Sequence, residues 1–131
     1  MRVFTLDCLG TTLKITIDTS SSPDEDFRYV REKIAAFESK YSRFLPGNWL
    51  DKLNVSGTSD IDAEGHRMLA FALELAELTH GAFDPTVGPM LSRMGYGRKD
   101  ELGNACEIGY CHVELSADRV VLHNGVHLEF G

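Results

Sequence analysis

The sequence predicts an α+β fold in which two main helices pack on one face of a mostly antiparallel sheet. Three observations favour this class: alternating apolar and polar residues near the N-terminus, two long stretches with apolar residues at helical spacing, and short apolar stretches after residue 109 separated by turn residues. The chain has 131 residues, of which 43% are hydrophobic and 25% charged. These values are typical of one soluble globular domain.

Composition and charge argue against several classes of protein. A net charge of −7 without a basic cluster disfavours nucleic-acid binding, although backbone N–H groups and a metal ion can still hold an anionic ligand. No apolar run reaches about 18 residues, so no transmembrane helix is expected. Residues 1–7 lack the apolar core of a signal peptide. We therefore expect a cytoplasmic protein, or a periplasmic or membrane-anchored one if a leader was removed.

The first predicted elements are two strands followed by a long helix. Residues 3–7 and 11–18 predict strands joined by a Leu-Gly turn, because apolar residues alternate with polar ones in the second of them. Pro23, preceded by a serine, marks the start of a helix that runs to about residue 43, before a Leu-Pro-Gly stop. Its core-facing residues recur at helical spacing: Phe27, Val30, Ile34, Phe37 and Tyr41.

The middle of the chain predicts a second main helix. Residues 48–53 predict one short helical turn and residues 54–59 a loop. Asp60 or Asp62 can cap a helix that runs to about residue 79. Its core stripe is expected to consist of Met68, Leu69, Ala72, Leu75 and Leu78, with Phe71 at the margin.

The remaining elements are shorter. A glycine at position 81 predicts a left-handed helix end, and Asp84 with Pro85 predicts the start of a third helix that runs towards Leu91. Residues 93–106 are glycine-rich and charged, which predicts an exposed loop. A meander of three strands is expected to follow, with an Asn-Gly hairpin turn between the last two: 110–115, 119–123 and 126–130.

The run 81–89, Gly-Ala-Phe-Asp-Pro-Thr-Val-Gly-Pro, is the most specific motif in the chain. Each residue has a structural explanation alone: Gly81 ends a helix, Asp84 caps the next one and Phe83 packs. Together they predict a small polar recess walled by an aromatic ring, which suits an adenine edge or a nucleotide hydroxyl. The run resembles the signature of the ApbE-type FAD:protein FMN transferases, enzymes that cleave FAD and attach FMN to another protein.

Three further stretches resemble the same family, in the same order. Leu9-Gly10-Thr11 is similar to its Met-Gly-Thr element, and 41–44 followed by a Leu-Asn pair is similar to its Phe-Ser-x-Tyr segment, with Phe44 in the place of the tyrosine. The stretch 108–131 is similar to the strands that lead into Leu-Asp-Leu-Gly-Gly, with Glu129 in the place of the aspartate. The resemblance therefore covers nearly the whole chain, as a single N-terminal domain or half-domain of the family.

The resemblance implies a reaction and a set of binding residues. FAD would bind in a cleft with Mg²⁺ across its pyrophosphate, and a threonine of an acceptor flavoprotein would attack the FMN phosphorus and release AMP. The family's metal ligands and catalytic groups lie beyond the stretch it shares with this chain, so no catalytic or metal residue is assigned. The residues expected to contact FAD are Leu9, Gly10, Phe44, Ala82, Phe83 and Asp84, with Thr86 in second rank.

Two alternatives stay open. The chain could be a non-catalytic flavin or adenine-nucleotide binding module, or one half of a site completed by a second chain or another copy, for which an open edge of the strand 126–130 would offer pairing. Cys106, Cys111 and His112 could suggest a metal site, but their spacing is poor for zinc, and cysteines packed as small apolar groups are the favoured interpretation.

Overall fold

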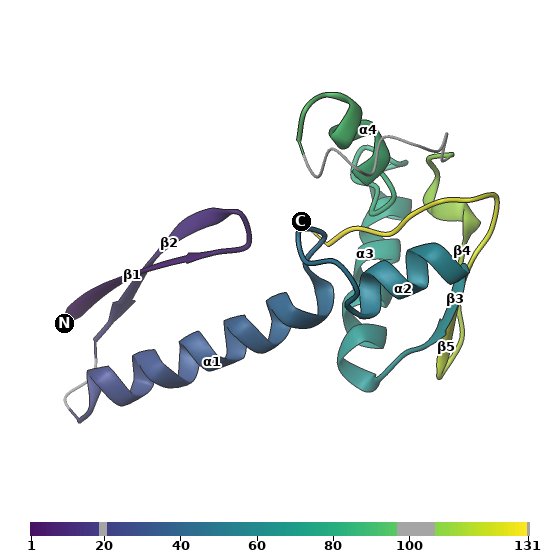
Figure 1. Cartoon of the computed structure of the whole chain (residues 1–131). Coiled ribbons are helices and arrows are strands. Elements are labelled where there is room, and N and C mark those ends of the chain that lie inside the picture. The colour runs from purple at the N-terminus through teal and green to yellow at the C-terminus, as the bar shows by residue number, and fades with distance from the viewer. Residues whose placement is uncertain (19–20, 97–106, 131) are drawn as a thin grey trace.

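The computed structural model describes residues 1–18, 21–96 and 107–130. It confirms the predicted fold class, with antiparallel strand pairs and the two main helices α1 and α3 (Figure 1). The strands form two sheets, a hairpin of β1 and β2 and a three-stranded sheet in the order β3-β5-β4. The elements in chain order are β1 (Arg2–Cys8), β2 (Thr11–Ile17), α1 (Pro23–Tyr41), α2 (Trp49–Ser56), β3 (Thr58–Asp60), α3 (Ala63–Leu78), α4 (Gly88–Arg93), the 3₁₀ turn η2 (Tyr110–His112), β4 (Val113–Leu115) and β5 (Arg119–Leu122).

The β1–β2 hairpin lies along α1, away from the three-stranded sheet (Figure 1). Its apolar face rests on the helix, where the rings of Phe4 and Phe27 stack with centroids 4.2 Å apart. Leu9 and Gly10 form the turn, both with positive φ, of 51° and 70°. This is the conformation that a two-residue hairpin turn requires, and it is unusual for a leucine.

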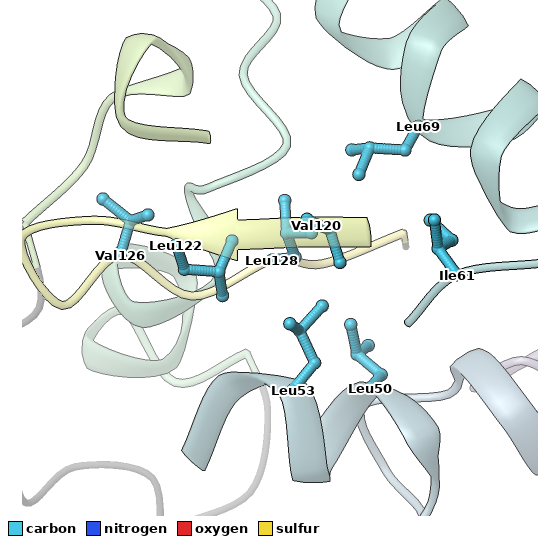
Figure 2. Packing of buried hydrophobic residues seen from close by; sticks show 8 residues of the cluster. All are labelled: Leu50, Leu53, Ile61, Leu69, Val120, Leu122, Val126 and Leu128. Carbon is cyan, nitrogen blue, oxygen red and sulfur yellow. The ribbon is translucent and has the colours of Figure 1, made fainter. Parts of the chain in front are cut away.

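The hydrophobic core lies between α2, α3, β5 and the segment 126–130 (Figure 2). Leu53 from α2, Leu69 from α3 and Val120 from β5 are fully buried. Figure 2 shows α2 and α3 approaching the strand and the C-terminal segment from two sides. The buried members are Leu50, Leu53, Ile61, Leu69, Val120, Leu122, Val126 and Leu128.

The loop predicted at 54–59 is wrong. Helix α2 continues to Ser56 and ends at Gly57, whose φ of 73° is left-handed and whose N–H donates to the carbonyl of Leu53. Residues 58–60 then form β3, which pairs antiparallel with β5. The glycine therefore ends the helix one turn later than predicted and turns the chain directly into a strand.

The strand predicted at 126–130 is also wrong, because this segment has no strand structure. Val126 and Leu128 are nevertheless buried. The backbone of Leu128 is paired with the side-chain amide of Asn54, which accepts from its N–H at 2.8 Å and donates to its carbonyl at 3.0 Å. We call this segment and its side-chain partners the C-terminal clasp. It removes the open strand edge that had suggested pairing with a second chain.

Two helix boundaries and the start of one strand differ from prediction. Helix α1 ends at Tyr41, two residues early, and α4 begins at Gly88, four residues after the predicted Asp84. The stretch 110–112 is a 3₁₀ turn, not the start of a strand. Within α3, Leu69 and Ala72 are buried as predicted, but Leu78 is exposed at the end of the helix, where the buried face runs through Ala76 instead. The loop prediction at 93–106 lies largely outside the described residues.

No helix in the described part of the chain combines the length and apolarity needed to cross a bilayer. The longest, α1, begins with three acidic residues and is polar on its outer face.

Asp62 caps α3 and pairs with Lys40 at the end of α1. Its Oδ1 accepts from the N–H of Gly65 at 2.9 Å, and its Oδ2 accepts from Lys40 Nζ. The hydrogen bonds from Lys40 and Gly65 hold the pKa of Asp62 below its usual value near 3.8. Burial lowers the pKa of Lys40, but the hydrogen bonds and charges of Asp62 and Tyr41 together raise it above its usual value.

We expect Asp62→Asn to cost about 0.5 kcal/mol of unfolding free energy at pH 7, because asparagine caps a helix as well as aspartate but leaves Lys40 unpaired. A depressed carboxyl pKa stabilises the fold above its unfolded value and stops doing so as pH falls through its folded value. The difference from wild type should therefore shrink below about pH 4. Urea unfolding at pH 7 and pH 3 checks this, and Asp62→Ala should add about 1 kcal/mol at both pH values. A pH-independent deficit in the Asn variant would contradict the assignment.

Candidate functional site

The run 81–89 begins where α3 ends. His80 and Gly81 both have positive φ, and the N–H of Gly81 donates to the carbonyl of Ala76 at 2.8 Å. This confirms the predicted left-handed helix end at Gly81. Thr79 Oγ1 then accepts from the N–H of Phe83 at 3.0 Å, so the chain turns tightly back and leaves Phe83 42% exposed and Ala82 exposed.

Asp84 organises the polypeptide around itself. Its Oδ1 accepts from both the N–H and the hydroxyl of Thr86, at 2.8 and 2.7 Å. Its Oδ2 accepts from the N–H of Tyr110 at 3.0 Å, and the fully buried Thr86 Oγ1 accepts from the N–H of Gly109 at 2.8 Å. The two side chains therefore join the motif to the chain before β4. This explains why Asp84 does not cap α4: its carboxylate is already paired.

Phe44 and the hairpin turn lie together, although 34 positions separate Phe44 from Gly10 in the sequence. The Phe44 ring packs so closely on Gly10 that a Cβ there would lie 3.2 Å from its Cε2. Phe44 is still 42% exposed. Glu38 of α1 accepts from the N–H of Leu9 at 2.9 Å, which holds the leucine in its left-handed conformation. Three of the residues expected to contact FAD thus form one surface.

A hollow of about 430 Å³ opens beside this turn. It is lined by Asp7, Cys8, Gly10, Thr11, Thr12 and Glu38. The carboxylates make it an acceptor-rich site, and Asp7 Oδ1 already accepts from the Thr12 hydroxyl at 2.6 Å. Burial, together with the charges of Glu38 and Asp7, raises the pKa of the Cys8 thiol, so the sulfur is a protonated small group here and not a nucleophile.

Arg43 and Glu129 connect the Phe44 surface with the motif run. The guanidinium donates to Glu129 Oε2, to Ser92 Oγ at 2.6 Å and to the carbonyl of Tyr96 at 2.9 Å. The N–H of Glu129 donates to the carbonyl of Pro85 at 2.8 Å. The sequence indicated Glu129 only as a departure from the family pattern and did not indicate Arg43. An arginine and a glutamate 86 positions apart carry no local signal of pairing.

Clusters of metal-ligating side chains were sought among the described residues. Among residues 1–18, 21–96 and 107–130, no three His, Cys, Asp or Glu side chains are grouped to hold a metal ion. Cys106 lies outside the described residues. Cys111 is exposed, so the prediction that it packs as a small apolar group is wrong, whereas Cys8 is buried.

The fold and these motifs define a class of protein. The model of the ApbE family matches residues 9–131, and the chain belongs to this family. A comparison with curated protein sequences gives no match.

Solved structures agree with the family. The ApbE protein from Thermotoga maritima is similar, with 26% sequence identity and a TM-score of 0.84. The match covers 98% of this chain and 46% of the Thermotoga chain. The flavinyl transferase ApbE from Pseudomonas stutzeri, in its apo form, has 19% identity and a TM-score of 0.80 over 98% of this chain and 46% of its own. The flavin transferase ApbE from Vibrio cholerae has 18% identity and a TM-score of 0.75 over 98% and 47%. The chain thus spans about half the length of these relatives.

Proposed function

We propose that this chain binds FAD as part of an FAD:protein FMN transferase. The observation that carries the proposal is the packing of Phe44 on the Gly10 turn beside an open hollow, two motifs of the family brought together from distant positions. Family membership and solved neighbours described as flavin transferases support the same function. In this proposal FMN passes to a threonine of an acceptor flavoprotein, AMP leaves, and Mg²⁺ serves the complete enzyme.

The proposed FAD contacts divide by exposure. The exposed Phe44, Phe83, Ala82 and Gly10 and the half-buried Leu9 can contact the ligand directly. Asp84 and Thr86 are occupied with backbone N–H groups, so their proposed role is to shape the polypeptide beside Phe83. Exposed aromatic rings suit flavin or adenine because both present flat π faces to a ring.

The charge of the hollow restricts which part of FAD it can take. Asp7 and Glu38 are acceptors and would repel the pyrophosphate. The hollow therefore suits a group that donates hydrogen bonds, such as a ribityl or ribose hydroxyl, an amine or a ring N–H. The pyrophosphate would lie outside it.

A second candidate function is a nucleotide-binding module without transfer activity. The same packing of Phe44 on the Gly10 turn beside the hollow supports it, because nucleotide binding needs only this surface. The related proposal, that a second chain completes the site, no longer has a strand edge at 126–130 to support it.

We expect Phe44→Ala and Phe83→Ala each to weaken FAD binding about tenfold, because stacking on a base is worth roughly 1–3 kcal/mol. Titration of FAD fluorescence measures this. The matched control is Phe71→Ala on the outer face of α3, an exposed ring away from both motifs, which should leave the affinity unchanged. Wild type that binds no FAD, or a control that weakens binding equally, would refute the proposed site.

Transfer is tested separately. The chain is incubated with FAD, Mg²⁺ and a threonine-bearing acceptor flavoprotein, and AMP and covalent FMN are measured. Both products support the transferase, and tight FAD binding without product supports the binding module.

A further inference from the structure

We infer that the buried Arg43–Glu129 ion pair is a positioning pair that sets the ring of Phe44 for stacking on the flavin nucleotide. The inference rests on the proposed function, because it concerns the same ligand. It assigns a role to two residues that do not themselves contact FAD. The burial of the pair, the contacts of Phe44 and the contacts of Glu129 support this inference.

The pair is buried, and both terminal nitrogens of the guanidinium donate hydrogen bonds. The side chains of Arg43 and Glu129 are only 7% and 11% exposed. One guanidinium nitrogen donates to Glu129, and another donates to Ser92 in α4 and to the Tyr96 carbonyl after it. A lysine has one compact ammonium group and cannot reach all three partners in a plane. The arginine therefore fixes α4 and the C-terminal clasp relative to the end of α1.

Phe44 is held between this guanidinium and the hairpin turn. Arg43 Cζ lies 5.7 Å from the centroid of the Phe44 ring, within the range of a cation–π contact. The same ring contacts Gly10. Its position therefore depends on Arg43 on one side and on the turn on the other, and a shift of the guanidinium moves the ring.

Glu129 brings the motif run into the same arrangement. Its N–H donates to the carbonyl of Pro85, and its carboxylate packs directly on Gly88, where any Cβ would overlap Oε2. In Figure 1 the C-terminal segment passes next to the connection between α1 and α2, where Arg43 and Phe44 lie. Because buried ion pairs contribute little net stability compared with apolar replacements, stability alone is a weak reason for this arrangement.

The test is a double-mutant cycle on FAD affinity with Arg43→Lys, Phe44→Ala and both together. Arg43→Lys keeps the charge and should weaken FAD binding about tenfold. The double variant should bind as weakly as Phe44→Ala alone, because Arg43 acts through the ring. The matched control is Arg119→Lys. Arg119 pairs with Asp60, and their side chains are 58% and 84% exposed. The affinity of this variant for FAD should equal that of wild type. Fluorescence of Trp49, the one tryptophan, confirms that each variant is folded at the temperature used.

Structural damage unrelated to Phe44 would lower FAD affinity in Arg43→Lys and in Phe44→Ala independently, so the two losses would add in the double variant. Additive losses in the double variant, or unchanged affinity in Arg43→Lys, would overturn the inference. If wild type binds no FAD, the proposed function fails. Amide hydrogen exchange then tests whether Arg43 couples the Phe44 segment to α4 and to segment 126–130. Arg43→Lys should accelerate exchange together in peptides covering 42–46, 85–94 and 126–130. Acceleration confined to 42–46 would overturn the inference independently of FAD.

Discussion

Replacement of Glu129 by alanine is expected to lower the free energy of unfolding by about 3–5 kcal/mol. The cost arises because Arg43 would stay buried with its charge uncompensated, which is more damaging than the loss of the pair itself. The segment 126–130 would also lose the carboxylate that holds it against α4. Since small domains have only about 5–15 kcal/mol of stability, this variant should be close to unfolding at 37 °C.

Urea unfolding followed by Trp49 fluorescence measures the loss. Asp60→Ala is the control, because it removes the carboxylate of the exposed pair with Arg119 and should cost less than about 1 kcal/mol. Glu129→Asp keeps the negative charge on a shorter side chain, so its unfolding free energy should fall between those of wild type and the alanine variant. Equal losses in the buried and the exposed pair would show that the burial of Arg43 carries no energetic weight.

Asn54→Ala is expected to cost about 2–4 kcal/mol, because it leaves both the N–H and the carbonyl of Leu128 without a partner next to the core. Leu128 itself is almost fully buried, so water cannot replace the lost amide without opening the core. The opening free energy obtained from hydrogen exchange of the Leu128 amide should fall by the same amount.

Two variants calibrate this result. Asn54→Asp keeps the acceptor for the Leu128 N–H but loses the donor, so its loss should be intermediate. Lys52→Ala, exposed on the same helix, should change stability by less than about 0.5 kcal/mol. If the Lys52 variant were as damaging as Asn54→Ala, the cause would be helix α2 and not the clasp.

The elements that could be predicted are those with local causes. The β1–β2 hairpin follows from alternation around a Leu-Gly turn, and α1 and α3 follow from apolar residues at helical spacing. Pro23 marks the first turn of α1, and Asp62 caps α3. The positive φ of Gly81 also follows from its place just after a helix. Each of these depends on residues only a few positions apart.

Several of the mispredicted features depend on partners that the local sequence pattern does not indicate. Alternation correctly placed Val126 and Leu128 in the core, but it reports burial and not backbone pairing, and the partner of Leu128 is a side chain 74 positions away. Asp84 before a proline looks like a helix cap, yet its carboxylate is used by Thr86 and Tyr110. Local patterns cannot choose between these partners.

The candidate site divides in the same way. The motifs containing Gly10, Phe44 and Asp84 were visible in the sequence, and the structure places the first two in contact. Arg43 and Glu38 were missed, because each acts through a bond to a residue far along the chain. Whether the predicted residues contact FAD stays a prediction.

The C-terminal clasp has a consequence for synthesis on the ribosome. Arg43 and Glu129 are 86 positions apart, so at roughly 5–20 residues per second the arginine waits about 4–17 s for its partner to be made. During this interval the nascent chain presents Arg43 without Glu129 and an apolar surface on α2 and α3 that lacks Val126 and Leu128. Such a surface is what chaperones bind and what makes nascent chains aggregate. Completion of this core therefore depends on the synthesis of segment 126–130 before the exposed surface associates with other proteins.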